Sequence, residues 1–307
     1  MEAANILDVQ NISKSFPGIK ALDRVKLTIK KGEIHALVGE NGAGKSTLMK
    51  ILSGVYMPDE GEIFLDGVRV YVKNPHHSEQ LGISIVYQEL SNFPAMNIAE
   101  NIAVGDYPKT KLGALDYKKL YARTQEILDE FELTDLKPKT DVRELSIGRQ
   151  QVVEILKASS RNSKILILDE PTSALTERET ELLFEIMRRL QERGISIIYI
   201  SHRLDEIFRI CNRATVLRDG KYVTTLDVAN TNKAELVKYM VGRDVAYNYG
   251  AHTTDIGDVI FEAQDISYGE IVKDVSFNLH AGEVLGIAGL EGAGRTELVE
   301  TLFGIRK

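Results

Sequence analysis

The sequence predicts an α/β fold built on a parallel sheet that is covered on both faces. Buried strands are indicated by four continuous apolar runs, at 34–38, 83–87, 165–168 and 195–200. Stretches with helical spacing of apolar residues separate these runs, and such alternation of strand and helix is typical of a parallel sheet. The first run leads into a glycine-rich stretch, 39–47, and then into a helix-like run. A glycine-rich loop is therefore expected at a strand-to-helix turn.

The composition bounds the class of protein. A chain of 307 residues with 43% hydrophobic and 27% charged residues is ordinary for a globular protein of two domains. The net charge of −7 argues against broad nucleic-acid binding, which needs clustered Lys and Arg, so we expect no nucleic-acid partner. No targeting segment or membrane-length apolar run is evident, and we expect a soluble chain. The single cysteine, Cys211, is expected to be a small buried apolar residue.

Residues 6–38 are expected to form an antiparallel layer that leads into the strand before the glycine-rich loop. Residues 6–38 contain short strand-like segments with turn signals between them, and 25–29 alternate apolar with polar residues. A hairpin is predicted over 61–67, because Asp-Gly marks its turn. Asn74 followed by Pro75 predicts the capped start of a helix.

The remainder of the first domain is predicted from the alternation of strands and helices. Residues 97–160 have a helical pattern, and we expect a helical insertion over about 89–160. Strands resume at 165–170 and 195–200, with an amphipathic helix between them. Ligands of parallel sheets bind at the carboxyl ends of the strands, and four residues follow such ends, namely Gly39, Gln88, Asp169 and His202.

The C-terminal part repeats the beginning of the chain. Residues 244–257 lack periodicity and are predicted to be a linker that closes a first domain of residues 1–243. Residues 275–304 then match 25–54 at a constant offset of 250, with 10 identities in 30. We therefore expect 258–307 to be the beginning of a second copy of this domain. Its apolar run 283–288 is predicted to be a strand without neighbours, so this tail should be poorly ordered unless it packs against another surface.

The glycine-rich loop predicts a binding site for a nucleoside triphosphate. Gly39, Gly42 and Gly44 allow a tight turn whose N–H groups point at phosphate oxygens, at the positive end of a helix dipole. Lys45 can reach the β- and γ-phosphates, and the Ser46 hydroxyl can ligate Mg²⁺. The alternative is a glycine-rich turn that matches by chance. The expected nucleotide-binding residues are Gly39, Asn41, Gly42, Ala43, Gly44, Lys45, Ser46 and Thr47.

Together with the strand 165–170, this loop resembles an ATP-binding subunit of the ABC transporter family. The resemblance covers residues 5–243 and the repeat, and it implies a P-loop NTPase fold with a RecA-like core. Residues 165–170 look like the Walker B strand of that family. This implies that Asp169 holds Mg²⁺ and that Glu170 is the general base for attack of water on the γ-phosphate, with ATP as the nucleotide. Taken alone, adjacent Asp and Glu at a strand end would suit a solvated turn or a helix N-cap.

The run 145–151 resembles the signature of the family. The resemblance implies that Ser146 and Gly148 bind the γ-phosphate of a nucleotide held by an opposing domain. The usual form is L-S-G-G-Q, so Ile147 and Arg149 depart from it. Without the family, Ser146 is best interpreted as a helix N-cap.

Further positions match other motifs of the family. Gln88 resembles the glutamine that contacts Mg²⁺ or the attacking water, and His202 resembles the histidine that donates a hydrogen bond to the γ-phosphate. Phe16 matches the aromatic residue that stacks on adenine, with a place in the strand core as the alternative. Thr176 stands where aspartate is common in the D-loop.

A narrower resemblance is to importers of simple sugars whose ATPase carries two tandem domains. It rests on Ser-Ala-Leu-Thr at 173–176, the run 150–155, and a second loop at 289–297. In that second loop Arg295 replaces the lysine. Because a guanidinium is broader than an ammonium group, we expect the second site to be degenerate.

These resemblances imply an ATPase that powers a membrane importer for a pentose or a hexose. The expected location is the cytoplasmic face of the membrane, as a peripheral subunit. The expected partners are transmembrane permease subunits, which would dock near 90–96, and, indirectly, a sugar-binding protein. A second nucleotide-binding domain is also expected, with a homodimer of this chain as one arrangement. Three alternatives stay open: a soluble tandem ABC protein acting on ribosomes or damaged DNA, a kinase built on the same loop, and an inactive nucleotide-binding fragment. The first would favour a basic linker, yet 244–258 contain no Lys or Arg.

Overall fold

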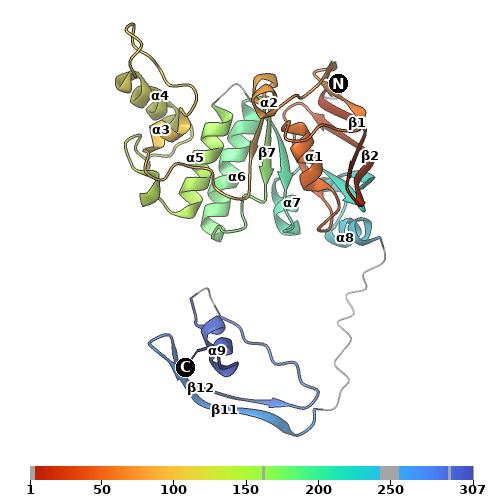
Figure 1. Ribbon diagram of the computed structural model, residues 1–307, viewed down its shortest axis with the longest axis vertical. Coiled ribbons are helices and arrows are strands. Elements are labelled where there is room, and N and C mark those ends of the chain that lie inside the picture. Colours follow the sequence, from red (N-terminus) through yellow and green to blue (C-terminus); the bar gives the residue numbers. More distant parts are fainter. Residues whose placement is uncertain (1–3, 161–162, 243–255, 290–291, 307) are drawn as a thin grey trace. The chain divides into compact units, whose positions relative to one another are not determined.

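The computed structural model describes residues 4–160, 163–242, 256–289 and 292–306. The chain divides into two compact units, Met1–Val245 and Ala246–Lys307, and each is described here by itself (Figure 1). Most of the predicted linker 244–257 lies outside the described residues, as do Leu290 and Glu291 of the second glycine-rich loop.

A six-stranded sheet forms the centre of the first unit. The strand order is β10-β9-β3-β8-β7-β6, and only β10 runs antiparallel to its neighbour. The predicted parallel sheet is therefore confirmed, with one antiparallel edge strand added. The strands are β3 Ile34–Val38, β6 Ile83–Val86, β7 Ile165–Asp169, β8 Ser196–Ile200, β9 Arg213–Arg218 and β10 Lys221–Asp227.

A separate antiparallel sheet has the strand order β2-β1-β4-β5. Strands β1 Asn5–Phe16 and β2 Ile19–Lys30 have 12 residues each and are longer than the short strands predicted. Register shifts, such as the one between Val9 and Ile12, let the pairing continue where strict alternation breaks down. Strands β4 Glu60–Leu65 and β5 Val68–Val70 form the predicted hairpin.

Helices and the antiparallel sheet cover the two faces of the central sheet (Figure 1). Leu166 and Leu168 of β7 pack on the face that holds α5 and α6, whereas Ile165 and Ile167 pack on the face that holds α1 and the antiparallel sheet. This division follows the two-residue period of a strand. The helices are α1 Lys45–Leu52, α2 Pro75–Leu81, α3 Ile98–Ile102, α4 Tyr117–Glu130, α5 Ile147–Ser159, α6 Glu177–Glu192, α7 Leu204–Ile210 and α8 Lys233–Val241, with 3-10 turns at Val142–Glu144 and Val228–Asn230. Within the described ranges, each helix is too short or too polar to cross a bilayer.

The segment 97–160 is largely helical, as its sequence predicts. Asn97 caps α3 in a capping box with Glu100. Leu128 and Phe131 at the end of α4 join the large core cluster, while Leu120 packs in a small cluster with Ala99 and Ala103. The amphipathic pattern of α4 therefore divides between two packing surfaces.

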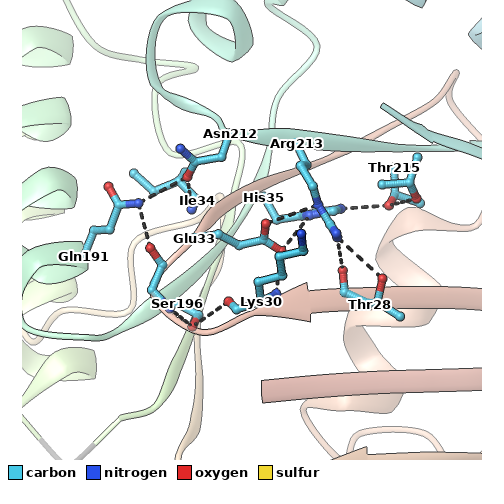
Figure 2. A network of polar contacts seen from close by, with 12 residues as sticks. Thr28, Lys30, Glu33, Ile34, His35, Gln191, Ser196, Asn212, Arg213 and Thr215 are labelled. Carbon is cyan, nitrogen blue, oxygen red and sulfur yellow. Dashed lines mark hydrogen bonds and ion pairs between the residues drawn. The ribbon is translucent and has the colours of Figure 1, made fainter. Parts of the chain in front are cut away.

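A buried polar network joins the two sheets of the first unit, as Figure 2 shows. Glu33, directly before β3, accepts a hydrogen bond from the Lys30 N–H (2.6 Å) and lies 3.1 Å from His35 Nδ1 and 3.2 Å from Arg213 Nε. Arg213 of β9 also donates to the carbonyl of Thr28 in β2 (2.7 Å). Burial alone would raise the pKa of Glu33, but the interactions with His35, Lys30 and Arg213 lower it on balance. Burial lowers the pKa of His35, which keeps its imidazole neutral near pH 7.

The second unit repeats the opening of the first. Strands β11 Val259–Tyr268 and β12 Val272–His280 form an antiparallel pair, and α9 Arg295–Leu302 has the bounds of α1 shifted by 250. The prediction of a strand over 283–288 is wrong, because these residues form no strand. In the first unit, β3 takes its hydrogen bonds from β8 and β9. Residues 283–288 have no such neighbours among the described residues of their unit, and Val284 is 76% exposed.

Candidate functional site

A pocket of about 530 Å³ lies at the carboxyl ends of β3 and β7. Its volume is in the range typical of small-molecule sites. The glycine-rich loop forms one wall, and Asp169 and Glu170 at the end of β7 form another. The lining residues are Ile19, Lys20, Ala21, Asn41, Gly42, Ala43, Gly44, Lys45, Ser46, Thr47, Asp169, Glu170, Ile200, Asp219 and Gly220.

The loop is shaped by close approaches of its backbone. A Cβ atom at Gly39 would lie 2.3 Å from the Leu217 carbonyl oxygen, so only glycine fits there. Gly44 is the N-cap of α1, and no side chain caps the first N–H groups of this helix. These N–H groups and the positive end of the helix dipole make the N-terminus of α1 suitable for a phosphate.

Lys45 contributes positive charge to the pocket beside the glycine-rich loop. Its Nζ donates hydrogen bonds to the carbonyl oxygens of Gly39 (2.7 Å) and Glu40 (3.1 Å). Burial lowers the pKa of Lys45, and the nearby negative charges of Glu170 and Asp169 oppose this shift. The ammonium group therefore lies between the loop and the two acidic residues, where it can contact the terminal phosphates of a nucleotide.

The acidic pair lies at the end of β7, next to the end of β8. The Glu170 N–H donates to the Ile200 carbonyl (3.0 Å), which ties the two strand ends together. Glu170 Oε2 lies 3.3 Å from Nδ1 of His202. Glu170 also has a left-handed backbone, with φ of 48°, which is rare for a residue other than glycine. The Glu170 side chain lines the pocket and contacts His202.

The polar groups of the pocket fit a magnesium ion bound together with phosphates. The Asp169 carboxylate and the Ser46 hydroxyl line the same pocket and are oxygen ligands of the kind that Mg²⁺ takes. Burial raises the pKa of Asp169, and the neighbouring charge of Glu170 raises it further. A cation at this position would favour the ionised carboxylate and offset both effects.

The roles of the predicted site residues stay predictions, and six of these residues do not line this pocket, namely Phe16, Gly39, Gln88, Ser146, Gly148 and His202. Phe16 stands edge-on to Tyr56, with 5.2 Å between ring centroids. Gln88 is exposed, two residues beyond the end of β6. Ser146 and Gly148 lie at the N-terminus of α5.

The N-terminus of α5 is bound by a carboxylate from the same chain. Ser146 is the N-cap of α5, as its interpretation without the family predicts, and its Oγ also donates to Glu179 Oε1 (2.7 Å). A Cβ at Gly148 would lie 2.4 Å from Glu179 Cδ, so glycine is required for this approach. The hydrogen bond from Ser146 is the main reason why the pKa of Glu179 is lowered, followed by one from Thr176. The donors expected to bind a phosphate therefore bind an anionic side chain here.

Sequence reasoning missed part of the pocket wall. Ile19, Lys20 and Ala21 come from the start of β2, and Asp219 and Gly220 come from the turn between β9 and β10. The dipeptide Asp-Gly signals a turn, but nothing in the sequence indicates that this turn reaches a loop about 180 residues away.

Comparisons with known proteins identify the family. Residues 22–173 match the family model described as ABC transporter. The chain is 50% identical over 303 residues to the galactose/methyl galactoside import ATP-binding protein MglA 1 of Photobacterium profundum, covering 98% of this chain and 61% of that protein. The chain belongs to the ABC transporter family. It is also 47% identical to the galactose/methyl galactoside import ATP-binding protein MglA of Clostridium perfringens, over 100% of this chain and 59% of that protein. This chain thus spans about three fifths of the length of these relatives.

The fold of the first unit is that of an ABC cassette. A crystal structure of the ADP conformation of MJ1267, an ATP-binding cassette of an ABC transporter, matches with a TM-score of 0.69 at 26% identity. The match covers 78% of this chain and all of that cassette. The predicted ABC ATPase fold is confirmed.

Proposed function

We propose that the chain is an ATP-binding and ATP-hydrolysing subunit that energises an ABC importer for a simple sugar, a pentose or a hexose. The observation that carries this proposal is that Lys45, Asp169 and Glu170 line the same pocket as the glycine-rich loop, and that Glu170 also contacts His202. Similarity to galactose/methyl galactoside import ATP-binding proteins supports the class of substrate that the importer would carry.

The proposed reaction assigns a task to each residue of the pocket. The loop N–H groups and the N-terminus of α1 hold the phosphates, and Lys45 exchanges its two neutral carbonyl partners for charged phosphate oxygens, which form stronger hydrogen bonds. Glu170 takes the proton of the water that adds to the γ-phosphorus, while the bond from that phosphorus to the bridging oxygen breaks, giving ADP and phosphate. His202 donates a hydrogen bond to the γ-phosphate. Mg²⁺ would be held by Asp169 and Ser46 and would neutralise phosphate charge, and Gln88 is proposed as a further group that contacts it or the attacking water.

The complete site is proposed to need two cassettes. Ser146 and Gly148 lie outside the pocket that contains Lys45, so they would complete the site of an opposing nucleotide-binding domain. A homodimer of this chain would bring them together. In the proposed organisation, residues 1–243 are the first nucleotide-binding domain, 244–257 are a linker and 258–307 begin a second domain. Arg295 replaces the loop lysine in that second domain, which argues against a second full site.

A groove beside Gln88 is proposed to receive a helix of the permease. Its volume is about 240 Å³, and Tyr87, Ser91 and Glu154 are among the residues that line it. The neighbouring side chains of Phe93 and Met96 are exposed. Exposed apolar side chains around a preformed groove are typical of a docking surface. Docking there would place the subunit at the cytoplasmic face of the membrane, with a sugar-binding protein as an indirect partner.

The test separates binding of ATP from its hydrolysis. Glu170→Gln should retain ATP affinity and lose phosphate release, because the amide cannot take the proton of the water. Lys45→Ala should instead weaken ATP binding itself. Phosphate release and equilibrium binding of ATP would be measured with Mg²⁺ for both variants and for the control Glu177→Gln, which removes one exposed carboxylate that does not line the pocket. Equal turnover of the wild type and Glu170→Gln would refute the assignment.

A further inference from the structure

A buried carboxylate on α7 plays no part in the reaction described above. Glu206 is only 3% exposed. A buried charge is costly unless several partners satisfy it. The Oε2 atom of Glu206 accepts hydrogen bonds from three hydroxyl groups, those of Thr172 (2.9 Å), Tyr199 (2.7 Å) and Ser201 (2.8 Å). Its other oxygen, Oε1, lies 2.8 Å from the guanidinium of Arg203.

Two of these partners belong to the segments that carry the proposed chemistry. Thr172 follows Glu170 by two residues, with Pro171 between them, and Ser201 directly precedes His202. The Ser201 hydroxyl additionally accepts a hydrogen bond from the Arg203 N–H (3.0 Å), which fixes the turn around His202. One carboxylate oxygen therefore holds both the segment after Glu170 and the segment around His202.

We propose that Glu206 is a positioning residue that fixes the spacing between Glu170 and His202 by binding Thr172 and Ser201 at the same oxygen. The inference rests on the proposed ATPase function. The contact between Glu170 and His202 is 3.3 Å long, and both groups face the reacting phosphate in that proposal. A displacement of about 1 Å at such a site can reduce the rate by up to roughly a hundredfold.

The alternative is that Glu206 only stabilises the core. The three hydroxyl partners offer a matched comparison, because each is buried and each donates one hydrogen bond to the same oxygen. Tyr199 lies within β8 and belongs to neither of the two segments. A role confined to stability predicts that loss of any one hydroxyl has a similar effect on turnover.

The experiment uses the full chain and three variants, Thr172→Val, Ser201→Ala and Tyr199→Phe. For the first two, kcat should fall about tenfold while KM for ATP stays within about twofold, because the nucleotide is held by the loop. For Tyr199→Phe, kcat should stay within about twofold of the wild type. Thr172→Ser, which keeps the hydroxyl, should restore turnover. If Thr172→Val fails to fold, Ser201→Ala and Tyr199→Phe still make the comparison.

A double variant tests the connection itself. Removing either hydroxyl already breaks the link, so Thr172→Val combined with Ser201→Ala should be no slower than the slower single variant. A loss equal to the product of the two single losses would overturn the proposal, as would equal kcat values in all three hydroxyl variants. A different result would refute the proposed function itself, namely release of phosphate by Glu170→Gln as fast as by the wild type. If Glu170→Gln is inactive but Thr172→Val and Ser201→Ala turn over normally, only the role of Glu206 is refuted.

Discussion

Glu179→Gln should strengthen the ATP-dependent association of two cassettes. In the structure, the Glu179 carboxylate accepts hydrogen bonds from the Ser146 hydroxyl (2.7 Å) and from the N–H and hydroxyl of Thr176 (3.1 and 2.9 Å). A γ-phosphate from an opposing cassette would have to displace this carboxylate from Ser146. Glutamine is also accepted in a capping box, so the start of α6 should remain capped in the variant.

The size of the effect follows from the hydrogen bond that the phosphate must replace. Hydrogen bonds to charged groups contribute about 1.5–3 kcal/mol and those between neutral groups about 0.5–1.5 kcal/mol. Exchanging the carboxylate for an amide should therefore weaken the contact with Ser146 by about 1 kcal/mol, which corresponds to about a fivefold change in an equilibrium constant. The pKa of Glu179 is lowered, so the competing charge is fully present at neutral pH.

The assay is phosphate release as a function of protein concentration. The half-maximal concentration should be about fivefold lower for Glu179→Gln than for the wild type. Glu177→Gln is the matched control, because it removes the same charge from the same turn of α6. An equal shift in both variants would indicate an effect of net charge. An increase in the half-maximal concentration for Glu179→Gln would show that the carboxylate supports association and would refute the reasoning.

Four further predictions concern stability, its dependence on pH, assembly and the second unit. Glu33→Ala should lower the free energy of unfolding by about 3 kcal/mol, because it leaves Arg213 without its carboxylate, whereas Glu62→Ala at an exposed ion pair should cost below about 1 kcal/mol. Urea unfolding should also show stability lost as pH falls, below about 6.5 for His35 and below about 4.3 for Glu33, because both folded pKa values are lowered. Phosphate release should rise faster than linearly with protein concentration, and strict linearity where sizing shows only monomer would contradict a composite site. Removing residues 244–307 should leave ATP affinity nearly unchanged and improve solubility, as measured by equilibrium binding and light scattering; loss of binding would mean that the domain boundary is wrong.

The features that the sequence predicts correctly are those with local signals. The helix after the glycine-rich loop begins at Lys45, the Asp66-Gly67 turn has positive φ at both residues, and Asn74 caps α2. Cys211 is buried, as its residue type favours. Each of these depends on a few consecutive residues, whose spacing and conformational preferences act wherever the chain goes.

The features that the sequence does not predict depend on distant partners. Residues 283–288 are as apolar as a buried strand, yet they form none, since a central strand needs hydrogen bonds from neighbours on both sides. Glu179 meets Ser146 across 33 positions, and Glu206 meets Thr172 across 34. No periodicity or sequence motif predicts such long-range contacts, because they form only when β7, β8 and the helices pack together.

The left-handed backbone at Glu170 implies a trade-off between the free energy of unfolding and the proposed ATPase activity. Such a conformation costs an ordinary residue about 1 kcal/mol or more, and glycine is largely free of this penalty. A laboratory selection for heat resistance alone should therefore accumulate Glu170→Gly, because survival on heating does not reward a carboxylate at the end of β7. If the chain powers a sugar importer as proposed, a selection that also demands growth on that sugar should keep the glutamate. Comparing the two populations would then measure how much stability the glutamate costs.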